Sequence, residues 1–126
     1  MRAIIQRVTY SKLTIAGKLY SEIGPGFMVL LGIEENDINE DAQWLAQKII
    51  NLRIMSDEED KMNLSLLDVK GEIMVISQFT LFASTKKGNR PSFLQSAKPD
   101  KAIPLYEFFI DEIKKIFPNK ITTGIF

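Results

Sequence analysis

The sequence contains neither cysteine nor histidine among its 126 residues. Without cysteine there can be no disulfide, no thiolate nucleophile and no zinc site built on thiolates. Without histidine the chain lacks the commonest general base and the commonest transition-metal ligand, so no Ser-His-Asp triad can be assembled. An enzyme made from this sequence must use carboxylates, lysines, backbone donors or groups that the substrate brings.

An excess of charge of either sign is also missing, because 16 basic residues balance 16 acidic ones. A neutral chain has no strong long-range attraction for nucleic acid, although it can carry a local basic patch, and we expect no DNA partner. No apolar run approaches a membrane span, and the opening Met1–Gln6 lacks the apolar segment of a signal peptide. We therefore expect one cytoplasmic domain without membrane contact.

Alternating polarity predicts several strands. Residues 2–10 are typical of a strand, and residues 13–23 of a hairpin whose turn needs Gly17. Residues 27–33 are almost continuously apolar, which predicts a central strand buried on both faces. Further strands are expected at 52–55, 72–81 and 121–126, with a polar loop at 56–63.

Helical spacing of apolar residues predicts two helices. The first opens at residues 37–40, where Asp37 or Asn39 can cap it, and buries a stripe beside which Trp44 sits. The second covers residues 102–117, with Pro104 in its first turn. Together the elements predict an α+β domain with a mixed or antiparallel sheet, or a partly closed barrel, covered by two helices.

The segment Ser77–Thr80 places uncharged hydrogen-bonding groups at the end of an apolar strand. Strand alternation would put Ser77 and Phe79 on one face, Gln78 and Thr80 on the other. These groups either satisfy backbone at the strand end or form a pocket wall. In a pocket, the amide and hydroxyls would position an ester or a sugar, and Phe79 could stack on a base.

Basic residues cluster in the turn Lys86–Pro91, which is either a solvated turn or a loop that contacts the phosphates of an RNA end. Arg7 lies within the first strand. It either forms an ion pair on the face of the sheet or organises a carbonyl-rich segment. The second role suits arginine because its donors form a rigid fork. The acidic runs 34–37 and 57–60 lack the spacing of an EF-hand, so we interpret them as solvated loops and expect no metal.

Five blocks in this order resemble the D-aminoacyl-tRNA deacylase family, formerly called D-tyrosyl-tRNA deacylases. They are Met1–Val8, Glu22–Gly26, Ser77–Leu81, Lys87–Phe93 and Thr123–Phe126. The resemblance covers the whole chain, and the combination of blocks is specific. It implies hydrolysis of the ester between a D-amino acid, or glycine, and the 3′-terminal adenosine of tRNA, which keeps D-residues out of translation. It also implies a cytoplasmic homodimer with its pockets at the subunit interface and no cofactor or metal.

The resemblance assigns roles to particular residues. It implies a pocket around the scissile ester lined by Ser77, Gln78, Phe79 and Thr80, with Ala102 as a small pocket-lining residue. Arg7 resembles the anchor of a loop that carries a Gly-Pro pair with a cis peptide bond. With Arg7 and Ala102, we expect the contacts to substrate and tRNA to come from Lys86, Lys87, Arg90, Pro91, Ser92 and Phe93.

Two mechanisms are open. Thr80 has been proposed as a nucleophile, whereas the alternative gives the chemistry to the ribose 2′-hydroxyl of the substrate. Thr80 needs a base to activate it, and the chain has no histidine, so we favour the substrate-assisted mechanism with backbone N–H groups near Phe79 as the oxyanion site.

The family's Gly-cisPro pair follows a further strand and excludes L-amino acids. The sequence stops at Phe126, before that point, so we expect a single deacylase domain over residues 1–126 without that strand and segment. The competing hypothesis is a non-catalytic domain that binds RNA ends or a nucleotide through Phe79 and the basic turn.

Overall fold

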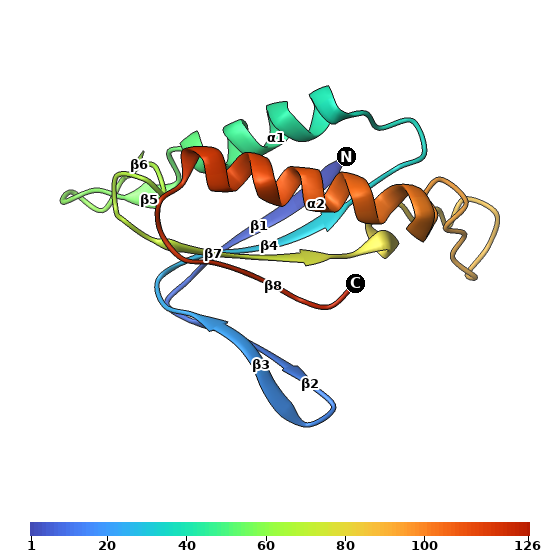
Figure 1. Ribbon diagram of the computed structural model, residues 1–126, viewed down its shortest axis with the longest axis horizontal. Helices are drawn as coiled ribbons and strands as arrows, with labels where there is room; N and C mark the ends of the chain where they lie inside the picture. Colours follow the sequence, from blue (N-terminus) through green and yellow to red (C-terminus); the bar gives the residue numbers. More distant parts are fainter.

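A computed structural model describes all residues, 1–126 (Figure 1). Its strands and helices, in chain order, are β1 (Arg2–Val8), β2 (Ser11–Ile15), β3 (Lys18–Ile23), β4 (Gly26–Gly32), α1 (Asn39–Asn51), β5 (Met55–Ser56), β6 (Met62–Leu64), β7 (Glu72–Ser77), the 3₁₀ helix η1 (Phe79–Leu81), α2 (Pro99–Ile116) and β8 (Ile121–Thr123). Neither helix is long and apolar enough to cross a bilayer.

Four strands form one mixed sheet in the order β1-β4-β7-β8. β1 pairs antiparallel with β4, whereas β4 with β7 and β7 with β8 pair in parallel. Both helices cover one face, and the hairpin β2–β3 lies on the other side (Figure 1). The prediction of an α+β domain with a mixed sheet under two helices is confirmed, and the chain closes no barrel.

The core lies between the sheet and the helices. Phe27, Val29 and Leu31 of β4 are fully buried, and Ile73 and Val75 of β7 lie beside the first two in register. The helices complete this core with Ala42, Ala46, Ile49 and Ile50 of α1 and with Leu105, Phe109 and Ile113 of α2. The predicted stripes on both helices are therefore confirmed.

Some predicted boundaries are wrong. The strand expected at 52–55 is reduced to β5, which pairs with β6 inside the predicted loop, and the strand expected at 121–126 ends at Thr123. The second helix starts earlier than expected, with Pro99 in its first turn, so Pro104 lies inside the helix. β4 is fully buried on one face only, because Met28 and Leu30 point to the face that the helices do not cover.

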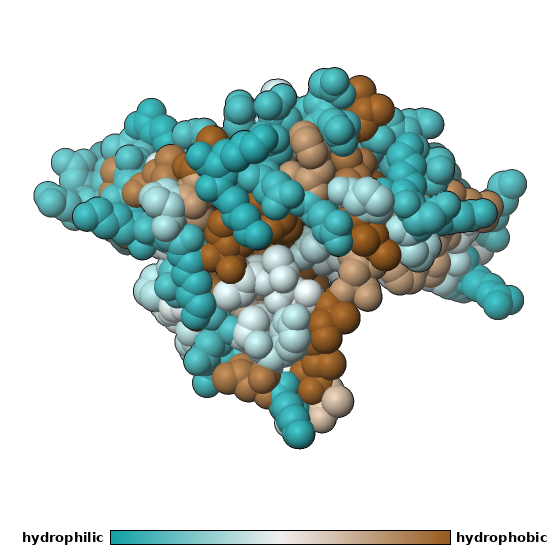
Figure 2. All heavy atoms as spheres, viewed as in Figure 1, coloured by the Kyte–Doolittle hydropathy of each residue, from teal (hydrophilic) through white to brown (hydrophobic).

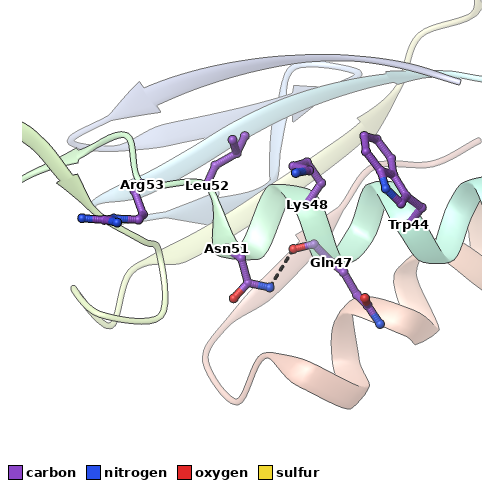
Figure 3. Close-up of a pocket in the computed structure, with 6 residues that line it drawn as sticks. All are labelled: Trp44, Gln47, Lys48, Asn51, Leu52 and Arg53. Atoms are coloured by element: carbon purple, nitrogen blue, oxygen red, sulfur yellow. Dashed lines mark hydrogen bonds between the residues drawn. The ribbon is translucent and has the colours of Figure 1, made fainter.

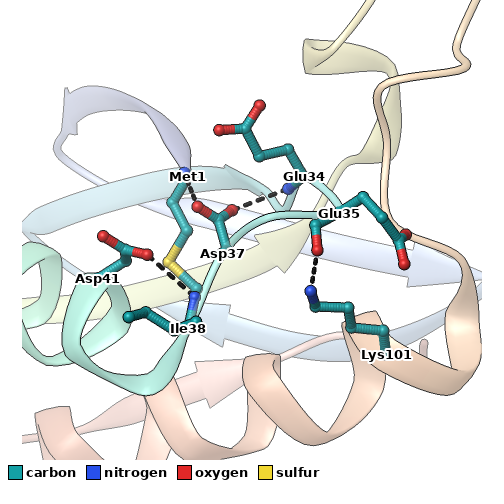
Figure 4. A network of polar contacts seen from close by, with 7 residues as sticks. All are labelled: Met1, Glu34, Glu35, Asp37, Ile38, Asp41 and Lys101. Carbon is teal, nitrogen blue, oxygen red and sulfur yellow. Dashed lines mark hydrogen bonds and ion pairs between the residues drawn. The ribbon is translucent and has the colours of Figure 1, made fainter.

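The cap of α1 also differs from the prediction. Ile38 is the N-cap residue, and its N–H donates to Oδ2 of Asp41 at 2.9 Å. Asp37 is engaged elsewhere: its Oδ1 accepts from the α-ammonium of Met1 at 2.6 Å, and its Oδ2 from the N–H of Glu34 at 2.8 Å (Figure 4). The carboxylate therefore ties the start of β1 to the loop that follows β4.

Loop 34–37 also reaches α2. The Lys101 ammonium donates to the carbonyl oxygen of Glu35 (Figure 4), and Glu34 forms an isolated antiparallel bridge with Ser96, just before α2. The side chains of Asp37 and Met1 are almost fully buried, with 5% and 2% exposure, and the ion pair itself is partly buried. This ion pair thus fixes the loop on which the approach to α2 rests.

Replacing Asp37 with asparagine should lower the free energy of unfolding by about 2–3 kcal/mol, because it leaves a partly buried ammonium without its counter-charge. The matched variant Asp41→Asn removes only a helix cap and should cost about 1 kcal/mol. Urea unfolding of both variants, each beginning at Met1, measures the difference. Equal losses in the two would contradict a structural role for this ion pair.

Candidate functional site

The candidate site forms where β7 ends. The last paired residues of β4 and β7 are Leu31 and Ser77, after which the Gln78 N–H donates to the Leu31 carbonyl at 2.8 Å. The chain then turns into η1 instead of continuing as the predicted strand to residue 81. The prediction that Phe79 shares a strand face with Ser77, and Thr80 with Gln78, is therefore wrong. β4 itself ends at Gly32, which leaves no partner for a longer β7.

Gly32 permits this turn. A Cβ added there would lie 2.9 Å from the Cβ of Leu81 and 3.2 Å from the ring of Phe82, so only glycine accepts the chain folding back so closely. The guanidinium of Arg2 also holds the turn, donating to the Leu81 carbonyl at 2.9 Å and lying over the Phe82 ring. The site is therefore built where two neighbouring strands stop together.

A cavity of about 80 Å³ opens beside this turn. It is lined by Leu31, Ile33, Ser77, Phe79, Ala97, Pro99, Ala102 and Phe126. The structure thus brings together three of the predicted site residues, Ser77, Phe79 and Ala102. No lining residue carries an ionisable side chain, so no side chain in the lining can act as a general base.

Two backbone donors are open at this turn. The N–H groups of Phe79 and Thr80 make no hydrogen bond, since they begin a 3₁₀ helix and have no carbonyl before them in the helix. The hydroxyl of Thr80 is already engaged, because its Oγ1 accepts from Nε2 of Gln78. The turn therefore has two N–H groups that can donate to an incoming oxygen. The Thr80 hydroxyl beside them is already hydrogen-bonded.

The basic turn lies next to Phe79. Ser84 and Ser92 exchange two backbone hydrogen bonds of 2.9 and 2.8 Å, which close the loop beyond the end of β7 (Figure 1). Phe93 packs edge-on against Phe79 with ring centroids 5.5 Å apart, and the Ser96 hydroxyl donates to the Phe79 carbonyl at 2.6 Å. Exposed members of this segment are Lys86, Lys87, Arg90, Pro91, Ser92 and Phe93.

Lys86, Lys87 and Arg90 form no ion pair. Three free cations therefore stand on a loop that is joined to the cavity wall through Phe93. This is the arrangement expected of a site that receives a charged chain beside a small uncharged pocket.

Arg7 lies elsewhere. It is paired with Phe27, whereas Ser77 is paired with Leu31, so the two positions are about 13 Å apart along the sheet at the usual strand rise. The guanidinium donates to the Ile54 carbonyl at 2.9 Å and to Oγ of Ser56 at 3.2 Å. Arg7 thus contacts one backbone carbonyl and one hydroxyl and forms no ion pair, and within one chain it does not join the site.

Tyr106 is a residue that sequence reasoning missed. Its hydroxyl donates to the Val75 carbonyl at 2.6 Å, and its ring packs edge-on against Phe126 at 5.7 Å. Burial, with a smaller contribution from Tyr20, raises the pKa of Tyr106 to about 12. The phenol is therefore neutral at ordinary pH and acts as a donor that fixes β7 and the Phe126 side of the cavity.

The C-terminal residues take part as well. Hydrophilic residues cover the outside of α2, whereas hydrophobic residues gather below it around the end of the chain (Figure 2). Phe126 belongs to the cavity lining, although its place beyond β8 gives no signal in the sequence pattern. Of the α2 residues in the lining, Ala102 is the one that the family resemblance implies, whereas Pro99 lies before the predicted start of the helix.

The acidic runs have local roles. Asp37 is held by Met1, as described above. Asp57 accepts from the backbone N–H of Lys61 and Glu59 and from the Asn63 side chain, and these contacts lower the pKa of its carboxyl group. Both carboxylates thus stabilise local turns by accepting hydrogen bonds from backbone N–H groups.

Residues 4–126 match the family described as D-Tyr-tRNA(Tyr) deacylase. Relatives named D-aminoacyl-tRNA deacylase, from Flavobacterium johnsoniae and Parabacteroides distasonis, are 56% and 54% identical over all 126 residues, which span 84% of each relative's length.

Two solved structures are also similar. One, described as the c-Myc DNA Unwinding Element Binding Protein, has a TM-score of 0.94 and 38% identity, and covers all of this chain and 85% of its own. Another, described as a probable eukaryotic D-amino acid tRNA deacylase, shares the fold with a TM-score of 0.74 and 19% identity, over 90% of this chain and 66% of its own. By its match over almost its full length, the chain belongs to the D-Tyr-tRNA(Tyr) deacylase family.

Proposed function

We propose that this protein hydrolyses the ester between a D-amino acid, or glycine, and the 3′-terminal adenosine of tRNA, as a chiral proofreading enzyme of the cytoplasm. The observation that carries the proposal is the turn after β7, where open backbone donors, an uncharged cavity and a free basic loop lie together. The names of the relatives from F. johnsoniae and P. distasonis support the same reaction.

The tRNA end would lie across the turn. Phe79 is 56% exposed and can stack on the terminal adenine, because aromatic rings hold unpaired bases in this way. Lys86, Lys87 and Arg90 would contact the phosphates that precede it. Pro91 and Ser92 would shape this loop, and Phe93 would keep Phe79 in position.

The cavity would hold the ester. Its volume is about 80 Å³, which is room for a few water molecules, so an ester carbonyl with the α-carbon would fit there.

The proposed chemistry uses the substrate's own hydroxyl. Water adds to the ester carbonyl carbon, and the N–H groups of Phe79 and Thr80 stabilise the negative charge that forms on the carbonyl oxygen. The ribose 2′-hydroxyl accepts a proton from the attacking water as it passes its own proton to the departing 3′-oxygen, so that it leaves the step unchanged. The products are a free amino acid and a 3′-hydroxyl, with Ser77 and Gln78 holding the ester and turn in place.

Thr80 has a positioning role in this mechanism. A threonine nucleophile needs a base within hydrogen-bond reach, whereas the Thr80 hydroxyl meets only the amide of Gln78 and no ionisable group lines the cavity. Metal and cofactor have no part in the proposed step.

A homodimer is a further part of the proposal. On the sheet face away from the helices, Ile4 is 52% exposed and lies beside half-buried Leu30, which in turn lies beside half-buried Ile76. This apolar row crosses three strands and would be covered by a second copy of the chain.

The alternative is a non-catalytic domain that binds RNA ends. One similar structure is described as a protein that binds a DNA unwinding element, and this description applies to that protein alone. We retain an RNA substrate for this chain, because net charge is zero and the free cations gather beside the small cavity instead of along a duplex-sized surface.

Incubation with D-tyrosyl-tRNA should release D-tyrosine in single-turnover assays. Thr80→Ala should lower the rate by about tenfold or less and should not abolish cleavage, because only positioning is lost. Release is measured by loss of the acid-precipitable ester, with L-tyrosyl-tRNA in a parallel reaction to report selectivity.

Binding of D-tyrosyl-tRNA without any cleavage would select the non-catalytic alternative. Complete loss of cleavage in Thr80→Ala, with tRNA binding intact, would make Thr80 the nucleophile.

The dimer is tested by sedimentation equilibrium at about 10 µM, a concentration at which a micromolar dimer is well populated. Ile4→Asp should give monomers, because it places a charge within the apolar row. Ile38→Asp is a matched control, since Ile38 is 55% exposed but lies at the start of α1. A wild-type protein that sediments as a monomer would remove this part of the proposal.

A further inference from the structure

A second hollow lies along α1 and the residues that follow it (Figure 3), and it shares no lining residue with the cavity beside the turn after β7. Its volume is about 380 Å³, and it is lined by Trp44, Gln47, Lys48, Asn51, Leu52 and Arg53. Trp44 is the only tryptophan of the chain and is 62% exposed. A smaller hollow, lined by Met1, Asp41, Trp44 and Leu45, lies on another side of the indole.

The larger hollow is cationic and amide-rich. Lys48 lies over the Trp44 ring, with Nζ 5.3 Å from the centroid, and forms no ion pair. Asn51 donates to the Gln47 carbonyl at 2.8 Å, which leaves its amide oxygen and the Gln47 amide available. No carboxylate lines the hollow.

Arg53 is held in place at the far end. Its Nε donates to the Asn63 carbonyl at 2.8 Å and its Nη2 to the Asn63 side chain, so Nη1 remains free. Its charge also acts on Asp68, whose pKa it helps to lower, after the stronger effect of hydrogen bonds from Ser65. Of the two cations, Lys48 therefore has fewer neighbouring groups that offset its positive charge.

These side chains have the chemistry of a nucleotide site. An exposed indole supplies a stacking surface for a base, and stacking of this kind is worth about 1–3 kcal/mol per base. Lysine and arginine supply donors to phosphate, and side-chain amides supply donors and acceptors to a base edge. An apolar partner surface would instead leave Lys48 and both amides without matching groups.

We propose that this hollow binds a nucleotide of the tRNA outside its 3′-terminal adenosine, with the base on Trp44 and the phosphate between Lys48 and Arg53. The proposal takes its RNA from the proposed function. Trp44 lies five residues into α1, about 8 Å along the helix from its start, and α1 starts at the loop that bridges to Ser96. One tRNA can therefore reach both places.

The single tryptophan makes the test direct. Uncharged tRNA is titrated into the intact protein, and the fluorescence of Trp44 is recorded beside the anisotropy of labelled tRNA. We expect stacking to quench Trp44 with the same midpoint as the anisotropy. Trp44→Ala should weaken tRNA binding by about fivefold to a hundredfold, as loss of one stacked base does.

A charge variant provides the second measurement. Lys48→Glu should weaken tRNA binding about tenfold and lower the slope of log affinity against log salt by about one. Lys18→Glu makes the same charge change on the exposed hairpin, and should leave the affinity within about twofold. Circular dichroism confirms that each variant is folded.

The outcomes separate this site from the proposed function. Quenching by tRNA together with weaker binding of Trp44→Ala supports the hollow, even where D-tyrosyl-tRNA is not cleaved. Unchanged fluorescence and unchanged affinity of both variants, with tRNA bound and D-tyrosyl-tRNA cleaved, would overturn the hollow and leave the proposed function standing. If Trp44 fluorescence changed with protein concentration but not with added RNA, this face would be a contact between copies of the chain. That result would also overturn the proposed nucleotide site.

Discussion

The hydrogen bond from the Gln78 N–H to the Leu31 carbonyl marks the point on which the candidate site depends. It closes the parallel pairing of β4 and β7, and the strands end close by, β7 at Ser77 and β4 at Gly32. The chain must then turn, and the close approach that Gly32 allows makes the turn a 3₁₀ helix with open donors. Tyr106 holds the same strand from the other side through the Val75 carbonyl. A small cavity at the end of a rigid sheet follows from these constraints.

Chemistry at this cavity is limited by what surrounds it. Its lining is uncharged, and the nearest phenol stays protonated because burial raises the pKa of Tyr106 to about 12. Backbone donors fixed by the fold need no reorganisation during a reaction, which makes them effective for a developing oxyanion. The protein thus supplies geometry and electrostatic stabilisation, and the mechanism that we propose assigns proton movement to the ribose of the substrate.

Periodicity predicted much of the fold, since the buried stripes of both helices and the strands β1, β4 and β7 follow local patterns. The early end of β7 could not be predicted, because it depends on where β4 stops and on the space above Gly32. Ser77, Phe79 and Ala102 were expected at one pocket through family resemblance, and the cavity brings them together. Tyr106 and Phe126 were missed, since only the folded chain places them beside β7. The sequence pattern predicts the wrong cap for α1, because Asp37 binds the Met1 ammonium, which is distant from this helix in the sequence.

The central claim is that the substrate, and not the protein, supplies the hydroxyl group that drives cleavage. The most direct measurement compares D-tyrosyl-tRNA with the same tRNA ending in 2′-deoxyadenosine, both acylated at the 3′-oxygen, under single-turnover conditions with saturating protein. The account predicts that the deoxy substrate binds with similar affinity but is cleaved at least about a hundredfold more slowly. A positioned proton donor usually accelerates a reaction by at least about this factor. Cleavage of the deoxy substrate at an undiminished rate would contradict it.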